Sequence, residues 1–361
     1  MLEKRKLVAK LETNPQDYPK IDFYELHDGK MLYLLTKHGL WNRTHHPFLL
    51  CECMRGDPFK KDNEGNYLPH TCKLVTHESN IEKWERSLRR WNRQQQKITR
   101  GKLEKYSEAD HSSWAAEHNI GITHFGVHPK YLSRDNIRFD VFHLRCGVTR
   151  RVMDYLRNFI LRTTPELMQL FSNVLLEFWS EYNVLLWSMN ESFSQLKGPE
   201  LLCFIKNSSK IIQFLQNNFE RTNVVMDLCE MLKLWEEITP FLLITTIDEK
   251  EKYHDELKKW CDKLDSFYKV GGRSFMTKNK AHPGDDETFY LHVLRYYLPR
   301  IAKSTFEKHQ LGLGIFTMQG FERRNKESKN TLKRFSNNKG NVLMQNMRRL
   351  WDVYYYRTTA V

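Results

Sequence analysis

The sequence predicts a mainly α-helical protein with minor β structure. Between residue 140 and about residue 269, apolar side chains recur at the spacing of amphipathic helices, with short breaks near 163–165, 197–199 and 239–240. By contrast, a single segment, Ile21–Leu26, roughly alternates apolar and polar residues as a strand does. Hydrophobic residues make up 40 % of the 361 residues, which is enough to build a sizeable core.

The N-terminal part is expected to hold a helix over residues 2–13, the strand Ile21–Leu26 and a short helix over residues 31–40. Residues 41–78 are rich in Cys, His, Pro and Gly and are expected to be irregular. A lone strand leaves backbone groups unpaired at both edges. We therefore expect its partner strands either outside this chain or in short segments that the pattern does not reveal.

A strongly amphipathic helix is expected from about Asn80 onward. Its apolar stripe consists of Ile81, Trp84, Leu88 and Trp91. Four arginines fall mostly outside this stripe: Arg86, Arg89, Arg90 and Arg93. This helix is therefore expected to present one apolar face and one basic face.

The remaining elements follow from turn residues and helical periodicity. Loops are expected at residues 107–139, 271–272 and 282–286. Three further helices are expected over residues 288–303, 317–334 and 341–355. The C-terminal part is therefore predicted to be helical like the body of the chain.

The charge balance favours a polyanionic partner. Lys and Arg outnumber Asp and Glu by 57 to 44, giving a formal net charge of +13. Basic groups gain free energy by displacing counterions from phosphates, so nucleic acid is the favoured partner. The alternative is a solvated basic surface with no specific partner.

The cysteines and the apolar segments indicate the cellular environment in which the protein is expected. Seven cysteines without a regular framework indicate a reducing environment, with thiols buried or bound to metal. The charged N-terminal residues do not resemble a signal peptide. The most apolar stretches, Phe241–Ile244 and Val174–Leu176, are too short to span a bilayer, so a soluble protein with no membrane association is expected.

Three places could carry chemistry, and the first is Asp28. This carboxylate follows the predicted strand and precedes Gly29, a position suited to holding a metal ion beside a sheet. A turn aspartate in an Asp-Gly pair is the alternative, and by itself it is the favoured one.

The second place is the cysteine pair Cys51 and Cys53, followed by His70, Cys72 and His77. Two neighbouring thiolates and later Cys or His residues are able to supply the four tetrahedral ligands of a zinc ion. The alternative is two buried thiols with several loop histidines.

The third place is a predicted helix on which Glu322, Asn325 and Lys329 share one side. The basic residues around Glu322 are Arg323, Arg324, Lys326, Lys329, Lys333 and Arg334. An acid among bases is suited to hold a divalent metal while the bases hold DNA phosphates. The alternative, an ordinary charged surface helix, is favoured when this segment is considered alone.

Two late segments together resemble a known family. Tyr290–Ile301 and Gly314–Lys326 resemble the end of the catalytic core of the V(D)J recombinase catalytic subunit and of Transib-type transposases. In that family a histidine helix ends in Val/Leu-Pro, and a glycine-containing turn leads to the helix with the last catalytic acid. The segments Asp28–Leu35 and Phe139–Arg145 are also similar to a group of metazoan proteins that look like distant transposase derivatives. The resemblance runs in patches from Asp22 to Tyr356.

The resemblance implies the C-terminal part of an RNase H-like core interrupted by a large helical insertion. The implied divisions are a partial core (1–40), a Cys/His region with the basic helix (41–139), the insertion (140–287) and returning core helices (288–361). The leading strands and the first catalytic aspartate would precede Met1. We therefore expect this chain alone to be inactive in DNA cleavage.

The resemblance also implies two kinds of metal site. Asp28 and Glu322 would be catalytic ligands of Mg²⁺ or Mn²⁺ in a centre for DNA nicking and strand transfer. Cys51, Cys53 and His292 would bind Zn²⁺, while Tyr297 stands where the family has a second histidine. His70, Cys72 or His77 would then complete the zinc site, or the site would be absent.

The resulting expectation is a DNA-binding, transposase-derived nuclear protein, with a homodimer as one expected form. Its DNA contacts would come from the basic residues of the early helix and of the C-terminal segment already named. The alternative is a non-catalytic helical interaction protein or a zinc-containing binding protein.

Overall fold

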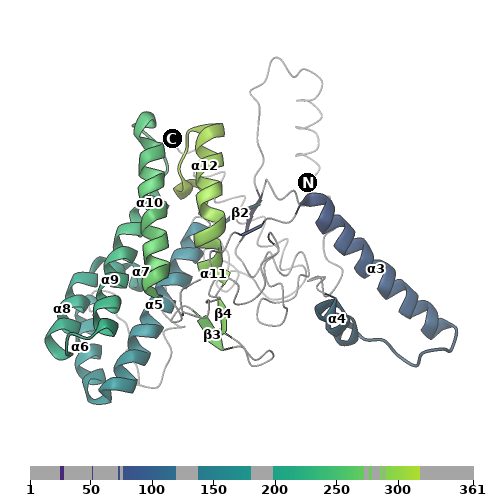
Figure 1. Ribbon diagram of the computed structural model, residues 1–361, viewed down its shortest axis with the longest axis horizontal. Helices are drawn as coiled ribbons and strands as arrows, with labels where there is room; N and C mark the ends of the chain where they lie inside the picture. Colours follow the sequence, from purple (N-terminus) through teal and green to yellow (C-terminus); the bar gives the residue numbers. More distant parts are fainter. Residues whose placement is uncertain are drawn as a thin grey trace, which may run out of the picture.

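The computed structural model describes residues 25–27, 51, 72–73, 76–118, 137–179, 198–271, 276–278, 285–287 and 289–317 (Figure 1). Most of these residues are helical, and the strands are only three residues long. The prediction of a mainly α-helical protein is confirmed. The RNase H-like core stays a prediction, because the described strands form only two-stranded sheets.

The predicted strand has a partner. β1 (Glu25–His27) pairs in parallel with β2 (Ile137–Phe139), with Leu26 opposite Arg138. β2 lies in the stretch 107–139 that was predicted to be a loop, so that prediction is wrong there. All three β2 residues are buried, and a short strand buried on both faces has no alternating pattern to reveal it.

The same stretch also contains a helix that the prediction missed. α4 (Glu108–Glu117) follows α3 (His77–Thr99), which is the amphipathic helix expected from Asn80. Thr76 caps α3 by accepting a hydrogen bond from the backbone N–H of Ser79 at 3.1 Å. α4 is short and carries few apolar residues, so its helical period is weak in the sequence.

A bundle of helices forms the body of the protein (Figure 1). It consists of α5 (Val141–Thr163), α6 (Met168–Trp179), α7 (Gly198–Lys206), α8 (Ser208–Asn218), α9 (Asn223–Ile238) and α10 (Lys250–Gly271). Pro165 and the 3-10 turn Thr239–Leu243 lie at two of the predicted breaks. The break between α8 and α9 was not predicted.

The bundle core lies between α5, α9 and α10. One face of α5 is buried along its whole length, from Leu144 to Ile160. The indole N–H of Trp235 in α9 donates to Thr149 Oγ1 of α5 at 3.0 Å, and that of Trp260 in α10 donates to the carbonyl of Ile238 at 3.1 Å. These bonds satisfy polar groups that burial would otherwise leave unpaired.

After α10 the chain forms a small hairpin and a long helical segment. β3 (Met276–Lys278) pairs antiparallel with β4 (Asp285–Glu287), which overlaps the loop predicted at 282–286. α11 (Phe289–His292), a π-helical turn (Val293–Tyr297) and α12 (Leu298–His309) follow. The helix predicted over 288–303 is thus confirmed and extends six residues further, to His309.

The last described segment returns to the bundle. The backbone N–H groups of Gly312 and Gly314 donate to the carbonyls of Thr245 and Ile244 at 3.1 and 2.7 Å. Beyond them, the carbonyl of Phe316 accepts from the N–H of Val141, the first residue of α5, at 2.9 Å. The chain therefore leaves the described region beside the end of β2 and the start of α5.

Candidate metal centre

Two cysteines and a histidine from distant parts of the chain meet in the interior. Cys51 Sγ lies 3.3 Å from His292 Nε2, and Cys72 Sγ lies 3.9 Å from the same nitrogen. The three donor atoms all lie within 4.8 Å of one another. Cys51 and Cys72 are each 2 % exposed and His292 is fully buried. We call these three residues the Cys2His cluster.

The helical segment α11–α12 positions two members of the cluster. His292 is the last residue of α11, and the preceding carbonyl, of Leu291, accepts a hydrogen bond from the hydroxyl of Tyr268 in α10. In the first turn of α12, the Arg300 guanidinium donates to the backbone carbonyl of Cys72 at 2.9 Å. The helix that carries the histidine therefore also holds the backbone of one cysteine.

The π-helical turn begins directly after His292. Pro299 has no N–H and its ring clashes with the carbonyl four residues earlier, so it disrupts regular α-helical bonding at Arg295. A π-turn accommodates such a defect without ending the helix, and π-turns occur frequently at functional sites. The Leu-Pro pair of the sequence therefore accounts for the irregular backbone beside the cluster.

The Cys2His cluster could hold a metal ion such as zinc. Zn–S bonds of about 2.3 Å and Zn–N bonds of about 2.0–2.1 Å in a tetrahedron place ligand atoms about 3.5–3.8 Å apart. The two sulfur–nitrogen distances of 3.3 and 3.9 Å lie close to this range. Thiolate and imidazole donors in a buried setting are typical of structural zinc sites.

Tyr297 occupies the position where the resemblance would place a second histidine. Its ring stacks on that of Phe139 in β2, with centroids 5.7 Å apart, and meets the ring of His292 edge-on at 5.3 Å. Tyr297 thereby packs the cluster against the β1–β2 pair. The Cys2His cluster and the small parallel sheet are therefore adjacent.

The structure brings together some of the predicted ligands. Cys51 and His292 meet as expected, and Cys72, one of the proposed substitutes, is the third member. Cys53 and His70, and the side chain of His77, lie outside the described residues. The same holds for Asp28, for Glu322 and for the C-terminal basic residues from Arg323 to Arg334.

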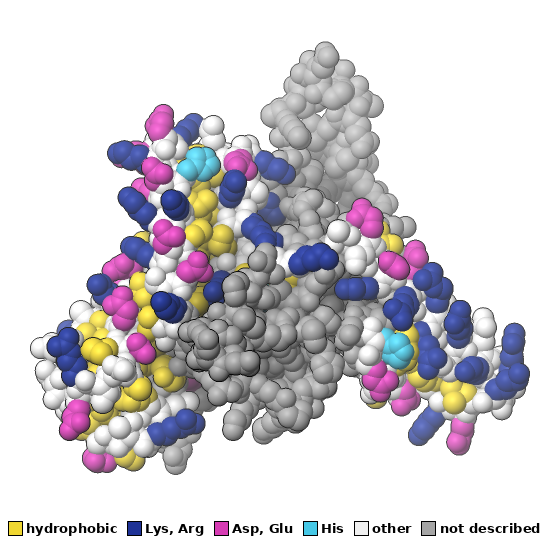
Figure 2. Space-filling view, viewed as in Figure 1, with side chains coloured by type: hydrophobic (Ala, Val, Ile, Leu, Met, Phe, Trp, Pro, Cys, Tyr) yellow, Lys and Arg dark blue, Asp and Glu magenta, His cyan; other side chains and the backbone are white. Residues whose placement is uncertain are grey.

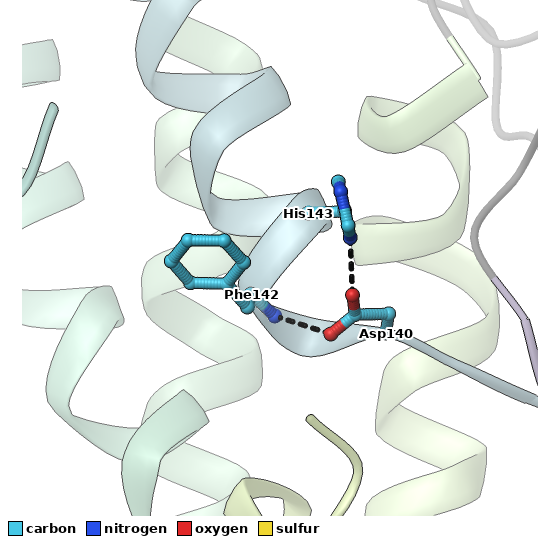
Figure 3. Close-up of polar contacts among 3 residues, drawn as sticks. All are labelled: Asp140, Phe142 and His143. Atoms are coloured by element: carbon cyan, nitrogen blue, oxygen red, sulfur yellow. Dashed lines mark hydrogen bonds and ion pairs between the residues drawn. The ribbon is translucent and has the colours of Figure 1, made fainter. Parts of the chain in front are cut away.

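A pair formed by the buried Asp140 and the partly exposed His143 at the start of α5 was not singled out from the sequence (Figure 3). Asp140 directly follows β2 and caps α5 by accepting from the N–H of Phe142 at 3.0 Å. Its other carboxylate oxygen contacts Nδ1 of His143. The carboxylate thus orients the imidazole, which is 30 % exposed. An Asp at a strand end with His three residues later was the available signal.

The comparisons with known proteins add no relative. The chain matches no protein-family model and no curated protein. Within the part of the chain that the structure describes, none of the helices has the length and apolar character needed to cross a bilayer.

Proposed function

We propose that this protein binds DNA and is related to metal-dependent DNA transposases of the Transib and V(D)J recombinase type, with a structural zinc ion at the Cys2His cluster. The observation that carries the proposal is the meeting of Cys51 with His292 across 241 positions. The resemblance implies this pairing of an early cysteine with the late histidine helix.

Two further observations support the proposal. β1 and β2 pair in parallel although the chain between them is long, as in an α/β core whose strands are linked by inserted segments. In addition, Phe316 is hydrogen-bonded to the start of α5, next to β2. Glu322 follows Phe316 by six positions in the sequence.

The zinc ion would act as a structural link rather than as a reagent. Its three described ligands are buried, which suits a site that stabilises the fold. Cys51 and Cys72 would bind as thiolates and His292 through Nε2. The catalytic role of Asp28 and Glu322 with Mg²⁺ or Mn²⁺ stays a prediction.

A helical interaction protein without a nucleic-acid role is the competing function. The two are separated by titrating the purified full chain into a labelled 30-base-pair DNA duplex at 50 mM and 200 mM salt. We expect salt-sensitive binding, because phosphate contacts release counterions. Absence of binding at 50 mM salt would contradict the proposal and favour the interaction protein.

A further inference from the structure

The basic residues of α3 gather on one side of the helix. With 3.6 residues per turn, they fall within about 120° of its circumference. They are Lys83, Arg86, Arg89, Arg90, Arg93, Lys97 and, at the C-cap, Arg100. The three acids of α3 all lie before Arg86. The second half of the helix therefore presents positive charge alone.

Five of these side chains are exposed and recur every three or four residues. They are Arg86, Arg89, Arg93, Lys97 and Arg100, which we call the basic row. Figure 2 shows dark blue side chains gathered along α3. Of the five residues in the basic row, only Arg89 has a carboxylate of the described residues in ion-pair range, that of Glu85 at 3.5 Å. The row is thus mostly uncompensated, unlike a charged surface with alternating signs.

The opposite side of α3 is occupied by α4. The buried Ala115 of α4 packs with Trp84 and Trp114. The fully buried His111 links the two helices, because its Nε2 lies 2.8 Å from the hydroxyl of Ser87 in α3. An amphipathic helix that inserts into a membrane surface needs its apolar face free. That face of α3 is covered, so the row is not explained by membrane insertion.

Arg90 differs from the row although it was predicted to contact DNA with its neighbours. Its guanidinium lies over the ring of Trp114, 5.4 Å from the centroid, and the side chain is half-buried. A cation–π contact of this kind fixes α4 against α3. Arg90 therefore stabilises the packing of α4 on α3, and Lys97 and Arg100 extend the row in its place.

We propose that the basic row binds the phosphate backbone of DNA, with up to five consecutive salt-sensitive contacts and no reading of base sequence. From Arg86 to Arg100 the row spans about 21 Å at 1.5 Å per residue. Phosphates of one strand advance about 3.4 Å each along a duplex, so the row matches about six of them. Arg and Lys suit phosphate contacts, which set position rather than sequence. This inference rests on the proposed DNA-binding function and assigns it a surface.

The number of contacts gives a quantitative expectation. For five phosphates, the slope of log K against log salt concentration is about −4.5. The affinity of the full chain for a duplex should then fall about 500-fold between 50 and 200 mM salt. Sequence should have little effect, so two unrelated duplexes should bind alike.

The test compares two triple variants of the full chain with equal loss of charge. The first is Arg86→Gln/Arg93→Gln/Lys97→Gln on α3, and Gln keeps a good helix propensity. The second, the control, is Lys258→Gln/Lys259→Gln/Lys269→Gln, whose lysines are exposed on α10 among acids. Far-UV circular dichroism verifies that both variants fold.

For the α3 variant, we expect the slope of log K against log salt concentration to become less negative by about 2.7. Its affinity at 50 mM salt should fall by about two orders of magnitude or more. The α10 variant should keep both values near those of the unmodified chain. Equal binding by the two variants, while the unmodified chain binds DNA, would overturn this surface and leave the proposed function standing. If the unmodified chain does not bind DNA, the proposed function itself fails.

Two further probes separate other polyanions from DNA. Poly-glutamate represents an acidic protein partner, and vesicles with phosphatidylserine represent an anionic membrane. We expect both to bind more weakly than the duplex at equal salt. Tighter binding of either probe, lost in the α3 variant, would overturn the proposal in favour of that partner.

Discussion

At the level of single residues, His292 connects parts of the chain that lie far apart in the sequence. Its Nε2 faces two thiols that come from the first quarter of the chain, while its ring packs against Tyr296 and Tyr297 of the same helix. The donor set of two thiols and one imidazole, with all three donor atoms within 4.8 Å of one another, suits a bound zinc ion.

The first prediction concerns this cluster. Cys72→Ser should lower the zinc bound by the purified chain from about one ion per molecule towards none, because the alcohol is a poor zinc ligand at neutral pH. The melting temperature should fall with it. Elemental analysis and a thermal melt provide the readouts.

Cys229→Ser is the matched control, since Cys229 lies in α9 and is not part of the cluster. It should retain the metal. Equal zinc content in the Cys72→Ser protein and the unmodified chain would contradict the assignment of Cys72 as a ligand.

The second prediction is a loss of stability at alkaline pH. Burial and the nearby carboxylates Asp265 and Asp262 raise the pKa of Cys261 from 9.0 to about 11, and burial raises the pKa of Tyr253 from 10.0 to about 12. In this range the unfolded chain loses protons first, so the free energy of unfolding falls as pH rises from 9 to 11. Cys261→Ala should make this decline shallower in urea titrations. An unchanged slope would show that the thiol does not contribute.

At the level of elements, two close backbone approaches hold the returning segment. A Cβ atom added at Gly314 would lie 2.4 Å from the carbonyl oxygen of Leu243, and one at Gly312 would lie 2.3 Å from that of Ile244. Both contacts are to backbone atoms, which are not able to rotate away. These glycines therefore allow residues 312–314 to lie directly against the backbone of residues 243–245.

The third prediction follows from this contact. Gly314→Ala should destabilise the protein by about 1–3 kcal/mol, since the clash forces the backbone apart. Chemical denaturation measures the change. Ser113→Ala, at an exposed site on α4, is the control and should change stability by less than about 0.5 kcal/mol. A Gly314→Ala protein as stable as this control would contradict the close approach.

The elements differed in how far the sequence predicted them. α3 was predicted because its apolar and basic residues separate clearly, and its C-terminal end shows a regular stop. There Gly101, with φ of +65°, allows its N–H and that of Lys102 to bond to the carbonyls of Ile98 and Lys97. β2 was missed because its three residues are all buried, so the sequence does not alternate between apolar and polar residues there. α4 was missed because it has too few apolar residues to show a helical period. Their formation depends on tertiary partners rather than on local pattern.

The metal cluster was predictable in part. Cys51 and His292 were identified because the resemblance paired an early cysteine with the late histidine helix. Cys72 was only one of several candidates, since 220 residues separate it from His292 and spacing does not specify long-range contacts. The Asp140–His143 pair was missed because a capping aspartate is common and its burial is set by the fold.

At the level of the whole molecule, the described residues form two separate hydrophobic clusters. The larger runs through the bundle and the smaller joins α3 to α4. Figure 1 shows α3 and α4 apart from the helices of the bundle. The two parts should therefore differ in local stability.

The fourth prediction tests this separation by hydrogen exchange. Leu156→Ala removes a fully buried side chain from α5 and should cost about 2–5 kcal/mol in the bundle. Amides of α5, α9 and α10 should then exchange faster, while those of α3 keep their rates. Equal acceleration in α3 would indicate a single cooperative unit.

The distance along the chain between the members of the Cys2His cluster has a consequence for synthesis. Cys72 is translated 220 residues before His292. At about 5–20 residues per second, the Cys72 thiol leaves the peptidyl-transferase centre roughly 11–44 s before the imidazole of His292. The helices made early in that interval, such as α3, have most of it in which to fold. A nascent chain stalled before α11 lacks His292, so the Cys2His cluster forms only after α11 has been synthesised.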